Sequence, residues 1–188
     1  MHIDRARGEI SLKIVYYGPP FSGKTTNLQQ LHDTMDPALR GSLTSLKNNE
    51  DRTLFFDYMQ VEFGKVGGLT PRFNLYTVPG QALYQATRKI VLRGADAVVF
   101  VADSAPAQLG ENLNSWRQLA EHLAEWKVDV QGFPVVVQLN KRDLPEAVPV
   151  ATLQRVLHLN GRACIEAQAI HGIGIRETLR SAIKAALE

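Results

Sequence analysis

The sequence predicts an α/β fold, with a mostly parallel six-stranded sheet, one antiparallel edge strand and helices on both faces. Apolar, β-rich runs alternate with stretches of helical spacing along the chain. Two strand-like stretches, residues 52–63 and 70–78, are joined by GKVGG, whose glycines suit a hairpin turn. The length of 188 residues fits a single domain, residues 1–188, which would bury about two-thirds of its unfolded surface.

The chain begins with a strand over residues 9–17, EISLKIVYY. The segment GPPFSGKTT then leads into a helix whose apolar positions, Leu28, Leu31 and Met35, share one face. The two strands of the following hairpin should pair antiparallel.

After the hairpin, strands and helices alternate. Further strands are expected at residues 95–104, 134–140 and 162–167, and further helices at residues 82–94, 109–126, 150–159 and 174–187. In the helix of residues 82–94, Ile90 and Val91 point toward one side together with Leu83. Apolar spacing in the next helix places both Trp116 and Trp126 in the core.

The segment between the first strand and the first helix, Gly18 to Thr25, matches the phosphate-loop pattern G-x-x-x-x-G-K-[ST]. In such a loop, backbone N–H groups and the helix N-terminus attract phosphate oxygens. Lys24 would bridge the outer phosphates, and Thr25 would bind Mg²⁺. The residues expected around the phosphates are Gly18, Phe21, Ser22, Gly23, Lys24, Thr25 and Thr26. A chance Gly-Lys-Thr turn that caps a helix is the alternative.

A second motif, from Asn140 to Asp143, follows the strand of residues 134–140 and matches Asn-Lys-x-Asp. The Asp143 carboxylate would accept hydrogen bonds from guanine N1–H and the 2-amino group, while Lys141 lies along the ring. Adenine has neither donor, so this carboxylate would be left unpaired with ATP. The alternative is an Asn-rich turn with a helix-capping Asp.

Composition excludes several other classes of protein. The net charge of +2 comes from scattered acids and bases, so nucleic acid is not an expected partner. A single cysteine, Cys164, and an amino terminus without a signal-peptide pattern favour the cytoplasm. The longest apolar run, residues 97–102, is far shorter than the roughly 20 residues of a membrane span, and no lipidation motif is present. With no intrinsic membrane anchor expected, any recruitment to a cell pole would depend on partners.

These motifs, together with KIVYYGP, DRTLFFD, YTVPGQ, RKIVLRGAD and VVFVADSAP, resemble a small Ras-like GTPase of the P-loop NTPase fold. The resemblance is strongest to the bacterial MglA-type GTPases of gliding and pilus polarity. It runs from about Ile10 to the final helix and is less clear at residues 1–8 and 37–50. It implies a protein that binds GTP or GDP with Mg²⁺, hydrolyses GTP slowly and is switched off through a Roadblock-type dimer.

The resemblance also assigns roles around the terminal phosphate. Gly80 would meet the γ-phosphate through its N–H, and Gln81 would orient the attacking water. The alternative for Gln81 is a polar residue at a helix start. Thr53 would sense Mg²⁺ and the γ-phosphate, so the expected metal ligands are Thr25 and Thr53.

One position departs from the usual Ras-like pattern. Where most such proteins have Asp-x-x-Gly-Gln, this sequence has Thr77-Val-Pro-Gly80-Gln81, and the MglA-type family carries the same Thr. A hydroxyl can accept a hydrogen bond from metal-bound water but brings no charge, so Mg²⁺ affinity should be lower than with a carboxylate.

In the MglA-type group, the arginine at the position of Arg52 can act in cis on the charge of the transferred phosphoryl group. The alternative is a surface ion pair with Glu50 or Asp51. Pro20 occupies the place where many Ras-like proteins have Gly and where an arginine from a partner would approach. Its bulk favours a catalytic arginine supplied by this chain.

The family pattern includes a Ser-Ala-Lys-like tripeptide whose small residue offers its N–H to guanine O6. Glu166-Ala167-Gln168 is the candidate, which adds Ala167 and Gln168 to the expected base site. An ordinary transition from strand to loop fits these residues equally well.

Three functions follow from these patterns. The first is an active GTPase switch in cell polarity or motility, whose effectors are unknown. The second is a nucleotide-binding scaffold with negligible hydrolysis, suggested by Thr77. The third, an ATP-using kinase, is disfavoured by the guanine motif. The strand of residues 52–63, with Phe55, Phe56, Tyr58 and Val61, is the expected effector surface, although alternate residues must face inward.

Overall fold

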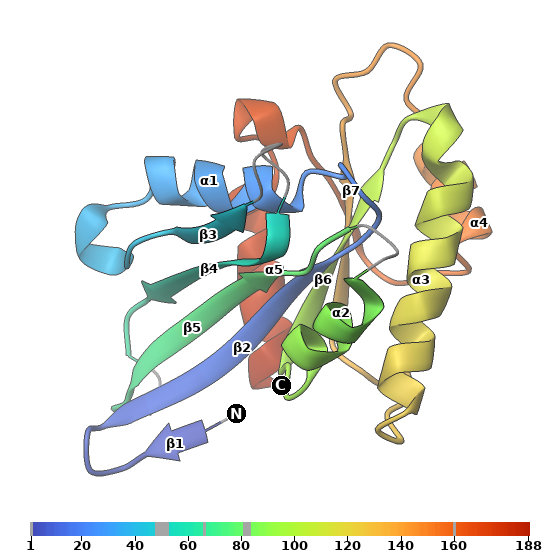
Figure 1. Cartoon of the computed structure of the whole chain (residues 1–188). Coiled ribbons are helices and arrows are strands. Elements are labelled where there is room, and N and C mark those ends of the chain that lie inside the picture. The colour runs from blue at the N-terminus through green and yellow to red at the C-terminus, as the bar shows by residue number, and fades with distance from the viewer. Residues whose placement is uncertain (1, 48–52, 66, 81–83, 160) are drawn as a thin grey trace.

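A computed structural model describes residues 2–47, 53–65, 67–80, 84–159 and 161–188 (Figure 1). The two expected catalytic residues, Arg52 and Gln81, lie outside the described residues. Thr53 is the first residue of a strand.

A mixed sheet of eight strands forms the centre of the described chain, in the order β3-β4-β5-β2-β6-β7-β8, with β1 paired to β2. The strands are β1 His2–Asp4, β2 Glu9–Tyr17, β3 Thr44–Lys47, β4 Thr53–Glu62, β5 Thr70–Thr77, β6 Ala97–Asp103, β7 Val135–Asn140 and β8 Cys164–Glu166. From β5 through β2 and β6 to β8 all neighbours are parallel, whereas β4 runs antiparallel to β5 and β3 antiparallel to β4. The predicted fold class is confirmed.

The predicted number of six strands was too small. The two additional strands, β1 and β3, have three and four residues. Such short strands lack a long alternating pattern, and they form because the neighbouring β2 and β4 offer unpaired backbone groups at their edges. Both fall in the segments where the resemblance to the MglA-type family is less clear.

Helices cover both faces of the sheet, as predicted (Figure 1). They are α1 Lys24–Thr34, α2 Gln85–Leu92, α3 Leu109–Ala124, α4 Val150–Val156 and α5 Ile175–Leu187. Apolar side chains of α1 and α5 pack in one core, and those of α2, α3 and α4 pack in a second core on the opposite face. The strands β6 and β7 are buried along their whole length because both cores contact them.

Two side chains expected in the core are exposed. Trp116 is buried against Phe100, with ring centroids 4.9 Å apart, but Trp126 is 37% exposed because α3 ends at Ala124. On the short helix α2, Val91 faces the core while its neighbour Ile90 is 73% exposed. Helical spacing identified the segments but not the last residue of α3 or the orientation of α2.

The hairpin strand β4 divides its side chains between the two faces. Met59 and Val61 are buried in the core of α1 and α5, so Val61 is not part of an effector surface. On the other face, Phe56 and Tyr58 lie beside Tyr76 of β5, at centroid distances of 5.9 and 4.9 Å. Within the expected effector surface, Phe56 and Tyr58 are therefore partly exposed, and they form an aromatic group with Tyr76.

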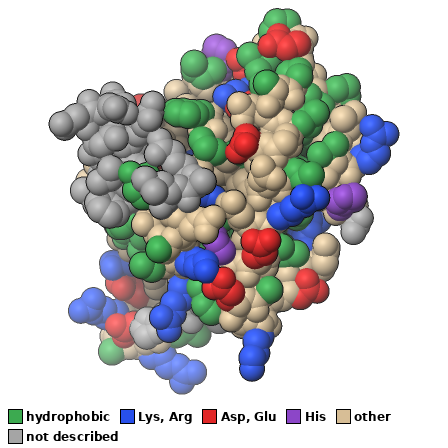
Figure 2. Space-filling view, turned by 45° about the vertical axis from the view of Figure 1, so that its right-hand side comes forward, with side chains coloured by type: hydrophobic (Ala, Val, Ile, Leu, Met, Phe, Trp, Pro, Cys, Tyr) green, Lys and Arg blue, Asp and Glu red, His purple; other side chains and the backbone are tan. Residues whose placement is uncertain are grey.

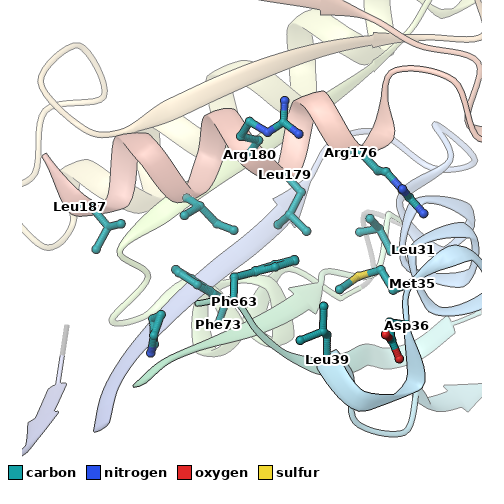
Figure 3. Close-up of a pocket in the computed structure, with 12 residues that line it drawn as sticks. Leu31, Met35, Asp36, Leu39, Phe63, Phe73, Arg176, Leu179, Arg180 and Leu187 are labelled. Atoms are coloured by element: carbon teal, nitrogen blue, oxygen red, sulfur yellow. The ribbon is translucent and has the colours of Figure 1, made fainter. Parts of the chain in front are cut away.

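A mainly apolar cavity of about 540 Å³ opens between α1, the β4–β5 hairpin and α5 (Figure 3). Its lining includes Met35, Phe63, Pro71 and Leu179. Because Pro71 lies near the start of β5, this cavity is at the opposite end of that strand from Thr77.

Acidic and basic side chains are interspersed on the face shown in Figure 2. Among the described helices, none combines the length and the apolar character required to cross a membrane.

Candidate nucleotide site

The predicted motifs converge at the carboxyl edge of the parallel strands. Gly18 follows the last residue of β2, Gly80 lies three residues beyond the end of β5, and Asn140 is the last residue of β7. Asp103, the last residue of β6, is directly opposite Asn140 in the ladder. This edge is where ligands bind in open α/β sheets, so the fold brings together motifs that are far apart in the sequence.

The phosphate loop contains backbone conformations with positive φ, and position 23 in particular requires glycine. Gly23 has φ +99° and a Cβ there would overlap the Asn140 amide nitrogen. Helix α1 begins at the next residue, Lys24, so its first N–H groups face the loop. Phe21 has φ +58° and is 71% exposed, while Ser22 is fully buried. Thr26 lies within the first turn of α1.

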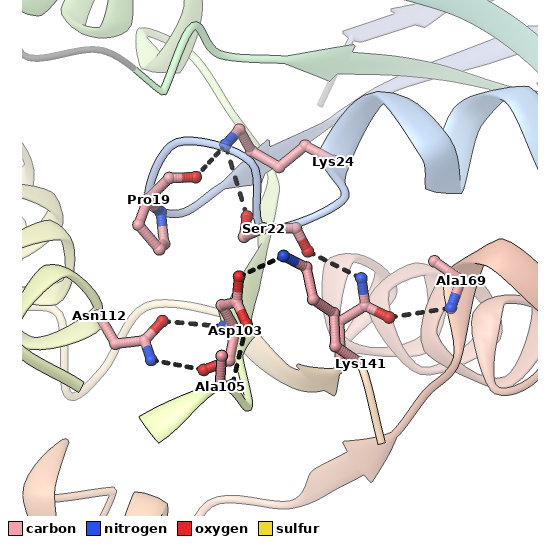
Figure 4. Close-up of polar contacts among 9 residues, drawn as sticks. Pro19, Ser22, Lys24, Asp103, Ala105, Asn112, Lys141 and Ala169 are labelled. Atoms are coloured by element: carbon pink, nitrogen blue, oxygen red, sulfur yellow. Dashed lines mark hydrogen bonds and ion pairs between the residues drawn. The ribbon is translucent and has the colours of Figure 1, made fainter. Parts of the chain in front are cut away.

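Lys24 is folded over the loop that precedes it (Figure 4). Its Nζ donates to Pro19 O at 2.6 Å and Gly18 O at 3.1 Å, with Ser22 Oγ at 3.5 Å. The pKa of Lys24 is lowered to about 7, chiefly by burial and also by the Arg88 charge, while Asp57 opposes the shift. The hydrogen bonds of this ammonium to the described residues go to neutral oxygens, so a phosphate anion at the loop would favour its charged form.

A buried carboxylate lies next to Thr25, although position 77 has none. Asp57 of β4 is fully buried, and its Oδ2 accepts hydrogen bonds from Thr25 Oγ1 at 2.6 Å and Thr77 Oγ1 at 2.8 Å. Its Oδ1 accepts one from Ser45 Oγ. The Asp57 N–H in turn donates to Thr77 Oγ1 at 2.8 Å.

The Thr77 hydroxyl therefore donates a hydrogen bond to the Asp57 carboxylate and accepts one from the Asp57 N–H. Asp57 faces Thr77 across the β4–β5 ladder because the adjacent residues, Tyr58 and Tyr76, are paired in register. A carboxylate on the neighbouring strand thus lies beside position 77, where the usual Ras-like pattern has one. The sequence contained one signal for it, a single acid within the apolar strand LFFDYM.

At the other end of the site, Asn140 joins its own strand to two other segments of the chain. Its Nδ2 donates to Ser22 O of the phosphate loop at 2.7 Å, and its Oδ1 accepts from the Ala169 N–H at 2.9 Å. The residue is only 2% exposed. Asn140 thus fixes the phosphate loop relative to the turn that begins at Ala169.

Lys141 is held by Asp103, which is not among the predicted site residues. Its Nζ forms an ion pair with Asp103 Oδ2 at 2.5 Å, and its backbone has φ +63°. Asp103 is buried, with its backbone N–H and C=O both bonded to the Asn112 side chain. Lys141 is therefore positioned before any base is bound.

Asp143 differs from its motif neighbours. Its side chain is exposed and forms no hydrogen bond or ion pair with the part of the chain that the structure describes. A carboxylate in this state can accept hydrogen bonds from a ligand without first breaking internal ones.

The segment expected to offer a backbone N–H to guanine O6 follows the end of β8. The Ala167 N–H donates to Leu139 O at 2.8 Å and the Gln168 N–H donates to Ile173 O at 3.0 Å, so both are engaged within the protein. The N–H that faces Asn140 belongs to Ala169, at the start of a 3₁₀ turn, Ala169–His171. The β8 strand is only three residues long, so its end could not be located from sequence.

A phosphate loop and a guanine motif at the carboxyl edge of a Ras-like sheet define a small GTPase. The ADP-ribosylation factor family matches residues 3–187, and the chain belongs to this family. Over 185 residues it is 44% identical to the mutual gliding-motility protein MglA of Myxococcus xanthus, covering 98% of this chain and 95% of that protein. It is therefore a small GTPase of the MglA type.

More distant similarity extends to human proteins. The chain is 26% identical to human ADP-ribosylation factor-like protein 4D, over 90% of this chain and 80% of that protein. It is 27% identical to human ADP-ribosylation factor-like protein 4C, over 80% of this chain and 70% of that protein.

Proposed function

We propose that this protein is a cytoplasmic molecular switch that binds GTP and GDP with Mg²⁺ and hydrolyses GTP slowly. The observation that carries the proposal is the Asn140 side chain, which joins the phosphate loop at Ser22 to the turn at Ala169. One residue thereby couples a phosphate-binding element to a guanine-binding element. The similarity to the Myxococcus xanthus gliding-motility protein supports a role in bacterial polarity or motility.

In this proposal Asp143 accepts hydrogen bonds from guanine, and Lys141, held by Asp103, lies along the ring. The turn that begins at Ala169, instead of Ala167 and Gln168, borders the base. The guanine-specific donors match Asp143, whereas ATP would leave this carboxylate without partners.

The residues present also fit Mg²⁺. Among the described residues there is no cluster of three or more His, Cys, Asp or Glu, which agrees with an ion that prefers one or two protein oxygens, water and substrate phosphates. Thr25 and Thr53 would be its protein ligands. Asp57 would orient Thr25 and add negative charge beside the ion, because a ligand that donates its proton to a carboxylate binds a cation more strongly. When bound, Mg²⁺ would offset charge on the outer phosphates.

Gly80, Gln81 and Arg52 are proposed for hydrolysis: Gly80 to meet the γ-phosphate, Gln81 to orient water and Arg52 to stabilise the transferred group. The close packing of Gly80 on Pro20 supports an arginine supplied by this chain, since that side of the loop is filled. A Roadblock-type dimer is the proposed activating partner. We expect Arg52→Ala to abolish partner-stimulated hydrolysis but to preserve GDP affinity, and unchanged stimulation would contradict the role of Arg52.

The test of the proposed function is single-turnover hydrolysis by the purified protein, with GTP, with and without Mg²⁺, and with ATP as control. We expect a Mg²⁺-dependent GTP rate near the intrinsic Ras value of about 10⁻⁴ per second and no ATP turnover. Tight GTP binding without turnover, even with the activating partner, would instead support a nucleotide-reading scaffold. Equal use of ATP would contradict the base-reading assignment.

A further inference from the structure

Arg88 is a buried cation that the proposed chemistry does not use. It lies on α2 and is only 2% exposed. No carboxylate among the described residues forms an ion pair with it. Burying a guanidinium without a counter-charge is costly, so the groups that do contact it indicate why it is there.

Its guanidinium holds the turn that carries Gly80. Arg88 Nε donates to Pro79 O at 2.8 Å, and Nη2 donates to Gly80 O. On its other side, Gly80 is pressed against the phosphate loop, where a Cβ would overlap the Pro20 backbone. Gly80 is therefore fixed between Arg88 and the loop.

The same guanidinium reaches helix α3 and the base of the phosphate loop. Arg88 Nη1 donates to Gln118 Oε1 at 2.5 Å. The guanidinium carbon also lies 5.8 Å from the ring centroid of Tyr17, the residue just before Gly18, and the Tyr17 hydroxyl is 3.1 Å from His122 Nδ1 of α3. Hydrogen bonds from charged donors are roughly twice as strong as neutral ones, so the bond from Arg88 to Gln118 connects α2 strongly to α3.

We propose that Arg88 is a positioning residue for the nucleoside triphosphate state: it holds Gly80 where its N–H meets the terminal phosphate and links that contact to α3 through Gln118. The inference rests on the proposed function. GDP lacks the phosphate that Gly80 would meet, so Arg88 should favour GTP over GDP and not nucleotide binding in general.

The test compares equilibrium affinities for GDP and for a non-hydrolysable GTP analogue, with Mg²⁺ present, in the full-length protein. We expect Arg88→Lys and Arg88→Met to weaken analogue binding at least tenfold and to change GDP affinity less than threefold. The matched control is Arg93→Met, because Arg93 follows α2, is exposed and makes no side-chain contact with the described residues. It should leave both affinities unchanged.

A second variant protects the test against misfolding of the Arg88 variants. Gln118→Met leaves Arg88 in place and removes only its partner on α3, so we expect a smaller decrease, of a few fold, in the ratio of analogue to GDP affinity. An unchanged ratio in all three variants would overturn the inference, and so would an equal loss of both affinities, which indicates a structural role alone. If the unmodified protein bound neither nucleotide, the proposed function would fail first and the inference with it.

Discussion

The base end and the phosphate end of the site differ in how their polar groups are satisfied. At the base end, both polar atoms of the Asn140 side chain are bonded to the protein, and Lys141 is paired with Asp103. At the phosphate end, the ammonium of Lys24 is buried against neutral carbonyls, which lowers its pKa to about 7. The base end is therefore a preformed frame, whereas at the phosphate end no carboxylate among the described residues forms an ion pair with the Lys24 ammonium, and a bound anion would favour its charged form.

The largest expected effect is at the phosphate end. Lys24→Met removes the cation that the phosphates would pair with, so GDP affinity should fall by about 10²- to 10³-fold. Because the buried charge is removed as well, the nucleotide-free variant should be at least as stable as the unmodified protein. Titration with a fluorescent GDP analogue and thermal unfolding measure the two quantities. Weakened binding together with reduced stability would show that Lys24 stabilises the nucleotide-free fold, which would contradict the proposed difference between the phosphate end and the base end.

At the base end, Asp143→Ala should mainly affect selectivity. Since the Asp143 side chain has no hydrogen bond to the described residues, stability should not change, while the preference for GDP over ADP should fall by about 10²-fold. Competition between the two diphosphates measures this. If the preference persisted, Asp143 would not read the base.

The neighbouring Asn140→Ala should behave in the opposite way. It leaves Ser22 O and the Ala169 N–H without their partner, so the free energy of unfolding should fall by about 1–3 kcal/mol. Urea unfolding of the nucleotide-free protein is the measurement, with Asp143→Ala as the matched control. Equal stability of the two variants would show that the base end is not preformed.

A pH dependence of stability is also expected at the phosphate end. Since the pKa of Lys24 is about 7 in the fold and 10.5 in the unfolded chain, the unfolded state binds more protons between those values. The free energy of unfolding should therefore rise with pH from about 7 to 10.5, by at most about 1.4 kcal/mol per pH unit. Subtracting the profile of Lys24→Met isolates this lysine from the tyrosines and Cys164. A difference that falls with pH would contradict the assignment.

The difference between the base end and the phosphate end also explains which site residues could be predicted from the sequence. At the base end, Asn140, Lys141 and Asp143 belong to one contiguous motif after a fully buried strand, so a local pattern was sufficient to select them. At the phosphate end, by contrast, Thr25, Asp57 and Thr77 meet only through the β4–β5 ladder and the packing of α1. Pairwise register across strands is not visible in one sequence, and for this reason Asp57 was missed.

Other features of the site could not be located from the sequence. The end of β8, which decides whether Ala167 or Ala169 borders the base, could not be located because a three-residue strand gives no periodic signal. The ion pair of Asp103 with Lys141 and the contacts of Arg88 were not predicted. They join residues that lie 38 positions apart for Asp103 and 8 to 30 positions apart for Arg88. Alternation of strands and helices, by contrast, was sufficient for the fold class because β2, β6 and β7 are long and apolar.

The proposal that Asp57 supplies the carboxylate of the metal site is tested most directly by the Mg²⁺ dependence of GDP release after an exchange of Asp57 and Thr77. These side chains face each other across the ladder and are hydrogen-bonded, so the carboxylate can move from one strand to the other. We expect Asp57→Thr to remove most of the slowing of GDP release by Mg²⁺, the added Thr77→Asp to restore much of it, and the control Ser45→Ala to have little effect. Full Mg²⁺ dependence in Asp57→Thr alone would contradict the claim that Asp57 supplies the carboxylate of the metal site.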